Sequence, residues 1–186
     1  MWKSTSGARL DIVEGMKTRA ITLALAAASL LLAPAAARGQ KAIFVVRHAE
    51  KISDTDQRLT DAGRARAARL AQMLKDSAVT AIYATDTERA RDTVKPLADA
   101  LGLKITTYDT GGGMSGKADA RPFVAALRKE HGGDVVLIAG HSNTIPDLLE
   151  ALGCPEAIEL ASNEYDNVFV VVPKADATAT LVRLRY

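Results

Sequence analysis

Residues 42–51 read AIFVVRHAEK. The stretch begins with an unbroken apolar run over residues 42–46, and Arg47 and His48 follow it. A continuous run of β-branched and aromatic residues is typical of a strand that is buried on both faces of a sheet. We therefore predict a strand over residues 42–47. It would place Arg47 at its carboxyl end and His48 immediately after it.

Strand-like and helix-like segments alternate along the rest of the chain. After a polar loop over residues 52–58, Thr60 can cap a helix with one apolar face. That face consists of Ala67, Leu70, Ala71 and Leu74. Further strands are predicted over 80–84, 104–107 and 134–139, and helices over about 86–101, 120–130 and 146–152.

Two closing strands, over residues 167–172 and 178–184, are compatible with an antiparallel pair. The alternation before them predicts an α/β fold: a single three-layer α/β/α domain with a mostly parallel sheet. In such sheets, ligands bind at the carboxyl ends of the strands.

The segment before the first strand has the pattern of a secretory signal peptide. From Met16, a short basic stretch leads into an apolar run over residues 20–33 and then small residues up to Ala37. We predict that Met16 is the true start, that residues 1–37 comprise upstream residues and the signal peptide, and that residues 38–186 form the domain. The protein would then be exported, to the periplasm or the medium.

A membrane anchor is the alternative interpretation of this apolar run. A spanning helix needs roughly 20 apolar residues, and this run is shorter and is interrupted at its end by Pro34. We therefore expect no stable membrane association after cleavage.

Charge and cysteine content disfavour several other classes of protein. The formal net charge is +2, and residues 1–37 account for it with four basic and two acidic residues, which leaves the domain without net charge. With no basic stripe, we predict no nucleic-acid partner. Cys154 is the only cysteine, so an intramolecular disulfide and a cysteine-based metal site are excluded, and we expect a buried apolar thiol.

Polar side chains follow three of the predicted strands. Arg47 and His48 follow the first, residues 85–89 follow the second, and residues 141–144 follow the fourth. A guanidinium at the end of an apolar strand is costly unless an anion pairs with it, and its planar fork matches phosphate oxygens. Arg89 falls on the first turn of a helix, where the N-terminus favours the same anion.

Two histidines stand at these strand ends. A neutral imidazole at His48 can attack phosphorus if one ring nitrogen keeps its proton and the other carries the lone pair. His141, protonated or donating, would stabilise charge on the transferring phosphoryl oxygens, and Ser142 and Asn143 could add donors. The third histidine, His131, precedes two glycines at a helix end, where we expect it to be solvated.

These residues resemble the histidine phosphatase superfamily, which includes the cofactor-dependent phosphoglycerate mutases. The resemblance is carried by the Arg47-His48 pair, the segment LTDAGRARA over residues 59–67, the Arg89-Ala90-x-x-Thr93 helix start and the Gly140-His141-Ser142 turn. It implies a phosphoglycerate mutase-like fold with His48 as nucleophile and a phosphate pocket made by Arg47, Arg89 and His141. It also implies that no metal and no cofactor is required.

The proton donor is open between two carboxyl groups. Family members commonly use an acidic residue after the helix that bears the second arginine, and the nearest match is Asp109, beside a glycine-rich segment over residues 111–116 that we expect to form a mobile lip. The usual glutamate motif is missing. Glu50, two residues after the expected nucleophile, competes with Asp109, and the donor must be partly protonated at the working pH.

The function predicted from the sequence is a metal-independent phosphatase that hydrolyses a small-molecule phosphomonoester through a phosphohistidine on His48. A catalytically weak or inactive phosphate-binding member of the same fold is the alternative. A phosphomutase is disfavoured, because mutase chemistry is expected in the cytoplasm. Three histidines without close pairing also disfavour a metal hydrolase.

Overall fold

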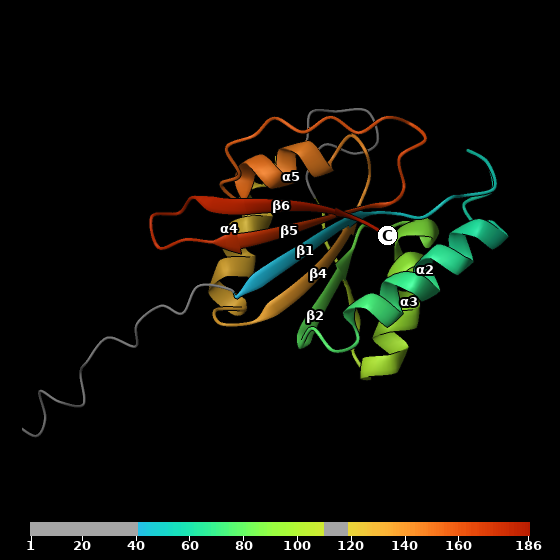
Figure 1. Ribbon diagram of the computed structural model, residues 1–186, viewed down its shortest axis with the longest axis horizontal. Coiled ribbons are helices and arrows are strands. Elements are labelled where there is room, and N and C mark those ends of the chain that lie inside the picture. The colour runs from blue at the N-terminus through green and yellow to red at the C-terminus, as the bar shows by residue number, and fades with distance from the viewer. Residues whose placement is uncertain (1–40, 110–118) are drawn as a thin grey trace, which may run out of the picture. The chain divides into compact units, whose positions relative to one another are not determined.

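The computed structural model describes residues 41–109 and 119–186 (Figure 1). The predicted signal segment and the glycine-rich segment over residues 111–116 lie outside the described residues. No helix in the described ranges is both long enough and apolar enough to cross a membrane.

Within these ranges, six strands form one mixed sheet in the spatial order β3-β2-β4-β1-β5-β6. They are β1 (Ala42–Arg47), β2 (Val79–Ala84), β3 (Ile105–Thr107), β4 (Val135–Gly140), β5 (Asn167–Pro173) and β6 (Ala179–Arg185). The first four run parallel to one another, whereas β5 pairs antiparallel with β1 and β6 antiparallel with β5. The predicted α/β fold, with its mostly parallel sheet and two closing strands, is therefore confirmed.

Helices cover both faces of this sheet (Figure 1). The helices α2 (Asp61–Leu74) and α3 (Glu88–Leu101) pack on one face, and α4 (Arg121–Glu130) and α5 (Ile145–Ala151) pack on the other. Residues of β1 alternate between the two apolar cores: Ile43 and Val45 pack with α4 and α5, and Val46 packs with α2 and α3. This double burial explains why the strand has no polar residue before Arg47.

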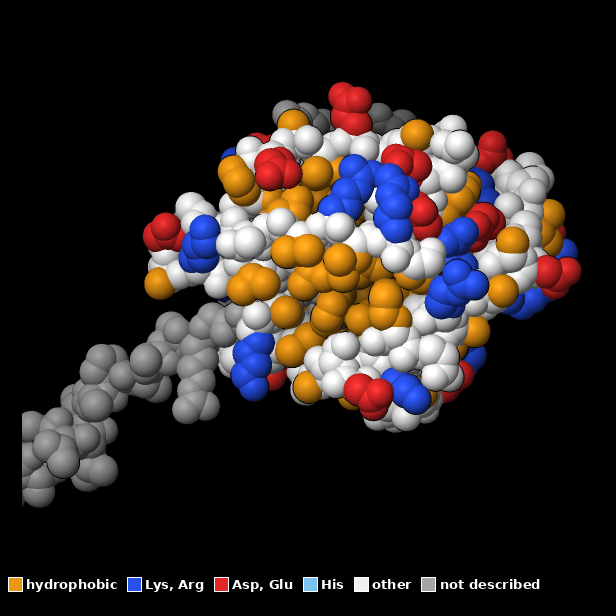
Figure 2. Space-filling view, viewed as in Figure 1, with side chains coloured by type: hydrophobic (Ala, Val, Ile, Leu, Met, Phe, Trp, Pro, Cys, Tyr) orange, Lys and Arg blue, Asp and Glu red, His pale blue; other side chains and the backbone are white. Residues whose placement is uncertain are grey.

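The β5–β6 end of the sheet leaves apolar side chains uncovered on the face that carries α2 and α3. Val172, Val182 and Leu184 lie on this face and are 41%, 45% and 45% exposed. Figure 2 shows the hydrophobic surface that results.

Local sequence signals set the helix ends. The Thr60 side chain accepts a hydrogen bond from the Gly63 N–H at the start of α2, as its capping role predicts. Gly102, with φ of 66°, ends α3 in the left-handed conformation that glycine adopts without strain. At Gly63 a side chain would collide with the carbonyl oxygen of Glu50, so glycine allows α2 to approach the segment after His48.

Three strand ends lie side by side at one edge of the sheet. Arg47 pairs with Gly140 at the ends of β1 and β4, and Ala84 pairs with Ala139 at the ends of β2 and β4. The polar clusters that follow these strands therefore meet, as the parallel arrangement predicts.

Candidate active site

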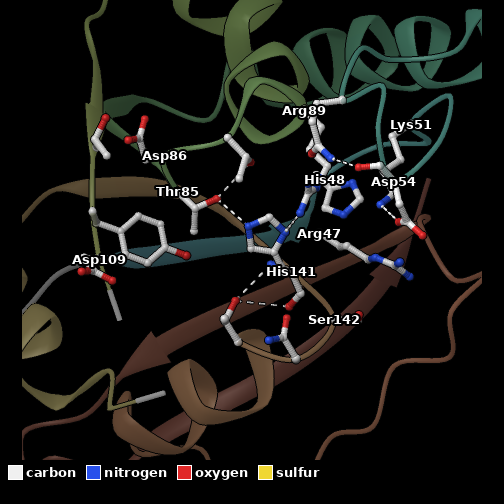
Figure 3. A pocket seen from close by; sticks show the side chains of 16 residues that line it. Arg47, His48, Lys51, Asp54, Thr85, Asp86, Arg89, Asp109, His141 and Ser142 are labelled. Carbon is white, nitrogen blue, oxygen red and sulfur yellow. Dashed lines mark hydrogen bonds and ion pairs between the residues drawn. The ribbon is translucent and has the colours of Figure 1, made fainter. Parts of the chain in front are cut away.

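A pocket of about 690 Å³ opens at this edge (Figure 3). It brings together all but one of the side chains selected from the sequence, and the exception is Glu50. The pocket is lined by Arg47, His48, Lys51, Asp54, Gln57, Thr85, Asp86, Thr87, Arg89, Thr107, Tyr108, Asp109, His141, Ser142, Asn143 and Thr144.

His48 is held as a neutral imidazole of one tautomer. Its side chain is buried, and its Nδ1 lies 2.8 Å from the carbonyl oxygen of Ala49, to which it can only donate. Burial lowers the pKa of His48 to about 3; the Ala49 hydrogen bond opposes this shift, and the nearby His141 and Arg89 add to it. The lone pair therefore lies on Nε2, as attack on phosphorus requires.

Thr93 fixes the peptide that orients His48. Its Oγ1 accepts from the Ala49 N–H at 2.8 Å and donates to the Arg89 carbonyl oxygen at 2.7 Å, and its side chain is fully buried. The sequence marks Thr93 only as part of a family signature, and this positioning contact was not predicted. A threonine on the buried face of a helix was the available signal, since its hydroxyl needs a partner there.

The side chains of His141 and Arg89 are in contact in the pocket (Figure 3). Nη2 of Arg89 lies 3.2 Å from Nδ1 of His141, and Nε2 of His141 lies 2.8 Å from the Thr85 hydroxyl oxygen. Because a guanidinium only donates, Nδ1 is the acceptor and the ring proton is on Nε2. Burial, and then the charges of Arg89 and Arg47, lower the pKa of His141 to about 4. His141 is thus a neutral ring whose proton points to Thr85, not a cation.

Arg47 is stabilised by the protein itself, which differs from the expectation that it needs an anionic ligand. Its Nη1 donates to the carbonyl oxygens of Ala161, Ser162 and Glu164 at 3.0, 3.1 and 3.1 Å. Its guanidinium carbon lies 4.1 Å from the ring centre of Tyr165, within the range of a cation–π contact. Arg47 still lines the pocket, so part of its fork can face a bound anion.

The two candidate proton donors occupy different places. Glu50 lies outside the pocket and forms a two-pronged ion pair with Arg66, with a shortest distance of 2.7 Å. Partial burial is the largest single influence and raises the pKa of Glu50, but the hydrogen bonds and charge of Arg66, a backbone hydrogen bond and the charge of Arg47 together outweigh it, and the pKa is lowered. The structure therefore argues against Glu50 as donor, whereas Asp109 lines the pocket beside Tyr108.

Several pocket residues were not singled out from the sequence. Lys51 and Asp54, which form an ion pair, are two of these residues. Thr85 was expected only among the polar residues after the second strand, and its hydroxyl orients His141. Ser142 and Asn143, which were expected as donors, line the pocket after β4. Lys51 and Asp54 lie in the loop that follows β1. Only the position of this loop next to a strand end could have indicated that they line the pocket.

The expectation of a solvated His131 was wrong. Its Nε2 lies 2.7 Å from the Tyr83 hydroxyl, and its Nδ1 lies 2.9 Å from the Asp134 carboxylate. None of these three residues lines the pocket. Across residues 41–109 and 119–186, no group of three or more histidine, cysteine, aspartate or glutamate side chains is arranged to hold a metal ion.

The fold and pocket define an α/β protein with Arg47 and two histidines at the strand ends and Arg89 on the first turn of α3. A model of the histidine phosphatase superfamily (branch 1) matches residues 43–110, a range that contains Arg47, His48 and Arg89. The probable phosphoglycerate mutase GpmB of Yersinia enterocolitica is 34% identical over 73 residues, which is 35% of this chain. The chain matches only 34% of that relative's length.

Solved structures share the fold over most of the chain. The protein histidine phosphatase SixA, complexed with tungstate, aligns with a TM-score of 0.61 at 20% identity, over 77% of this chain and 96% of its own. The alpha-ribazole phosphatase from Shigella flexneri aligns with a TM-score of 0.62 at 16% identity, over 78% and 96%. Together these matches support a similarity of this chain to the histidine phosphatase superfamily, with a phosphoglycerate mutase-like fold.

Proposed function

We propose that this chain is a metal-independent phosphomonoester hydrolase that acts through a phosphohistidine on His48. The observation that carries the proposal is the state of His48. Its ring is neutral, and its Nδ1–H donates to the Ala49 carbonyl oxygen. It lines a pocket that Arg47, Arg89 and His141 also line. A neutral ring with a fixed tautomer is the form in which histidine is a nucleophile.

In the first step, Nε2 of His48 attacks phosphorus, the N–P bond forms and the bond from phosphorus to the ester oxygen breaks. The ring becomes positively charged, and the Ala49 carbonyl stabilises it by accepting the Nδ1 proton's hydrogen bond. Arg47 and Arg89 offset the charge on the equatorial phosphoryl oxygens, which is the main way proteins promote this transfer.

In the second step, water attacks phosphorus, the N–P bond breaks and inorganic phosphate leaves. Asp109 is the donor that we assign to the leaving oxygen in the first step, and it would accept the water's proton in the second. Its position in the pocket lining supports this role, and the ion pair of Glu50 with Arg66 counts against the competing candidate.

Export from the cytoplasm is a further part of this proposal, and it rests on the signal-peptide pattern of residues 16–37. It favours hydrolysis over mutase chemistry. N-terminal sequencing of the protein recovered outside the cytoplasm should start near Arg38, and a start upstream of Arg38 would contradict the cleavage.

The test is release of phosphate from p-nitrophenyl phosphate by the purified protein, followed by acid-labile, base-stable labelling of the peptide that contains His48. His48→Asn should abolish both turnover and labelling. His131→Gln, which alters a histidine outside the pocket, should retain them, and EDTA should change neither. A label on another peptide, or loss of activity with EDTA, would overturn the mechanism. Phosphate binding without turnover would instead identify an inactive binding member of the fold.

A further inference from the structure

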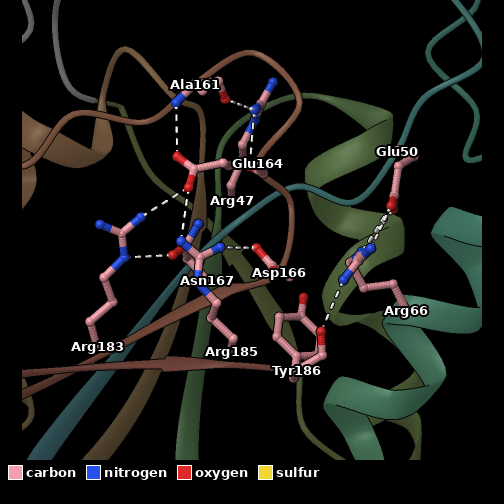
Figure 4. A network of polar contacts seen from close by, with 10 residues as sticks. All are labelled: Arg47, Glu50, Arg66, Ala161, Glu164, Asp166, Asn167, Arg183, Arg185 and Tyr186. Carbon is pink, nitrogen blue, oxygen red and sulfur yellow. Dashed lines mark hydrogen bonds and ion pairs between the residues drawn. The ribbon is translucent and has the colours of Figure 1, made fainter.

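Residues 161–165, between α5 and β5, lie against the side chain of Arg47 (Figure 4). Three of their carbonyl groups accept hydrogen bonds from the same nitrogen of Arg47, Nη1, and the Tyr165 ring packs against the guanidinium. An arginine recognises phosphate through the orientation of its planar fork. The position of these carbonyls therefore determines how Arg47 faces a ligand.

Burial alone does not hold this segment in place. Ala161, Ser162 and Asn163 are exposed, and none of residues 161–165 belongs to a helix or strand. Its geometry must come from polar contacts.

The carboxylate of Glu164 supplies the main contacts of this kind. Its Oε2 accepts from the Ala161 N–H at 3.0 Å, which closes the turn over residues 161–164. Its Oε1 accepts from Nη2 of Arg185 at 2.9 Å and from Nη2 of Arg183 at 3.3 Å, which ties the turn to β6 (Figure 4). The hydrogen bond from Arg185 is the leading cause of a lowered pKa at Glu164, so the carboxylate is ionised at neutral pH.

We propose that Glu164 is a positioning residue for the phosphate pocket. Its carboxylate fixes the turn over residues 161–164, and the carbonyl groups of this turn fix Arg47. Arg47 then binds the phosphoryl group, which Glu164 itself does not contact. Glu164 is not part of the pocket lining. The inference rests on the proposed function only in taking a phosphoryl group as the ligand.

The test measures binding of inorganic phosphate to the full chain by calorimetry. Glu164→Gln keeps the size of the side chain but removes its charge, and we expect about 10-fold weaker phosphate binding. The matched control is Asp166→Asn, which removes the 2.7 Å ion pair of Asp166 with Arg185 in the same network. Asp166 makes no side-chain contact with the turn in the described structure, so this variant should bind phosphate as the unmodified protein does.

A double-mutant cycle separates positioning from a general loss of structure. Arg47→Lys keeps the charge but lacks the planar fork, and in this background Glu164→Gln should change phosphate affinity by less than about 2-fold. An equal 10-fold loss in both backgrounds would mean that Glu164 acts independently of Arg47, and would overturn the inference. If Glu164→Gln does not fold, Arg185→Gln removes one partner of the carboxylate and must show the same coupling to Arg47.

The outcomes distinguish this inference from the proposed function. Coupled loss of phosphate binding in a protein without hydrolase activity would retain the role of Glu164 and reject the hydrolase. Hydrolysis with additive effects would do the reverse. Absence of phosphate binding in the unmodified protein would overturn both.

Discussion

Thr93 offers a substitution whose effects on stability and on activity should separate. Its hydroxyl links the Ala49 N–H to the Arg89 carbonyl, at 2.8 and 2.7 Å, inside a fully buried site. Thr93→Val replaces the hydroxyl by a methyl group of similar size and creates no cavity. Thr93→Ser keeps the hydroxyl and removes the methyl group.

The stability cost of each variant follows from what it leaves behind. In Thr93→Val the Ala49 N–H stays buried without an acceptor, which costs about 2 kcal/mol of unfolding free energy. In Thr93→Ser the lost methyl group costs about 1 kcal/mol. For a domain of this length, each kcal/mol lowers the melting temperature by about 3 °C, so the two variants should lie within a few degrees of each other.

Activity should discriminate between the variants far more strongly. The Ala49 peptide carries the carbonyl that holds Nδ1 of His48, so a shift of this peptide moves the nucleophile and releases its tautomer. We expect kcat for p-nitrophenyl phosphate to fall about 10- to 100-fold in Thr93→Val and to change little in Thr93→Ser. Nitrogen-15 NMR of the His48 ring should show loss of the fixed Nδ1–H tautomer in the valine variant only.

The result that refutes this reasoning is a valine variant with unchanged kcat, or a serine variant that loses as much activity as valine does. Urea unfolding of both variants is the control. If the fraction of unfolded Thr93→Val at the assay temperature accounted for its whole loss of kcat, Thr93 would be a packing residue without a positioning role.

Three further outcomes are expected. The pKa values of His48 and His141 are about 3 and about 4, below the ordinary value of 6.5. Between these values the unfolded chain binds more protons than the folded protein does. The urea midpoint of unfolding should therefore fall as pH drops from 6.5 to 4.5 and recover above 6.5. This slope should shrink when both histidines are replaced by glutamine; an unchanged slope would contradict burial as neutral rings. Arg89→Ala should lower kcat/KM about 100-fold through both kcat and KM, and an effect on KM alone would show ground-state binding only. Asp109→Asn should impair hydrolysis of alkyl phosphates more than of p-nitrophenyl phosphate, whose leaving group needs little protonation, whereas Glu50→Gln should not discriminate between them; the reverse pattern would restore Glu50 as donor.

The elements with local signals could be predicted closely from the sequence. The strand over residues 42–47 matches β1, Thr60 caps α2, and α3 ends at Leu101, as predicted. Caps and apolar runs act over a few residues, so they can be recognised without tertiary structure. The helix α3 starts two residues later than predicted: Thr87 is its cap, and the hydroxyl of the preceding threonine, Thr85, is hydrogen-bonded to His141.

The convergence of the pocket could also be predicted, because the carboxyl ends of parallel strands share one edge. The support of Arg47 could not. Its partners are carbonyl groups 114 to 117 residues away, on a segment without helical or strand periodicity. Glu50 was ambiguous for a related reason, since its partner Arg66 comes into reach only when α2 docks at Gly63. His131 was misplaced because the helix-end pattern carries no information about Tyr83, which lies on a different element.

The charges of the pocket suit an anion. Burial is the main cause of the lowered pKa of both His48 and His141, and the charges of Arg89 and Arg47 add to it, so both rings are neutral and the positive charge lies on the guanidinium groups. A phosphate dianion placed between these groups would reverse this effect, because a nearby negative charge raises a histidine pKa. In this structure Nδ1 of His141 accepts from Arg89, and a bound phosphate would favour a proton on Nδ1, so that His141 would donate to a phosphoryl oxygen. His48 keeps its Nδ1 proton in both states because the Ala49 carbonyl can only accept. The two histidines therefore differ in role because their hydrogen-bond partners differ. The partner of His48 is a backbone carbonyl, whereas the partner of His141 is Arg89, whose guanidinium can bind a phosphate instead.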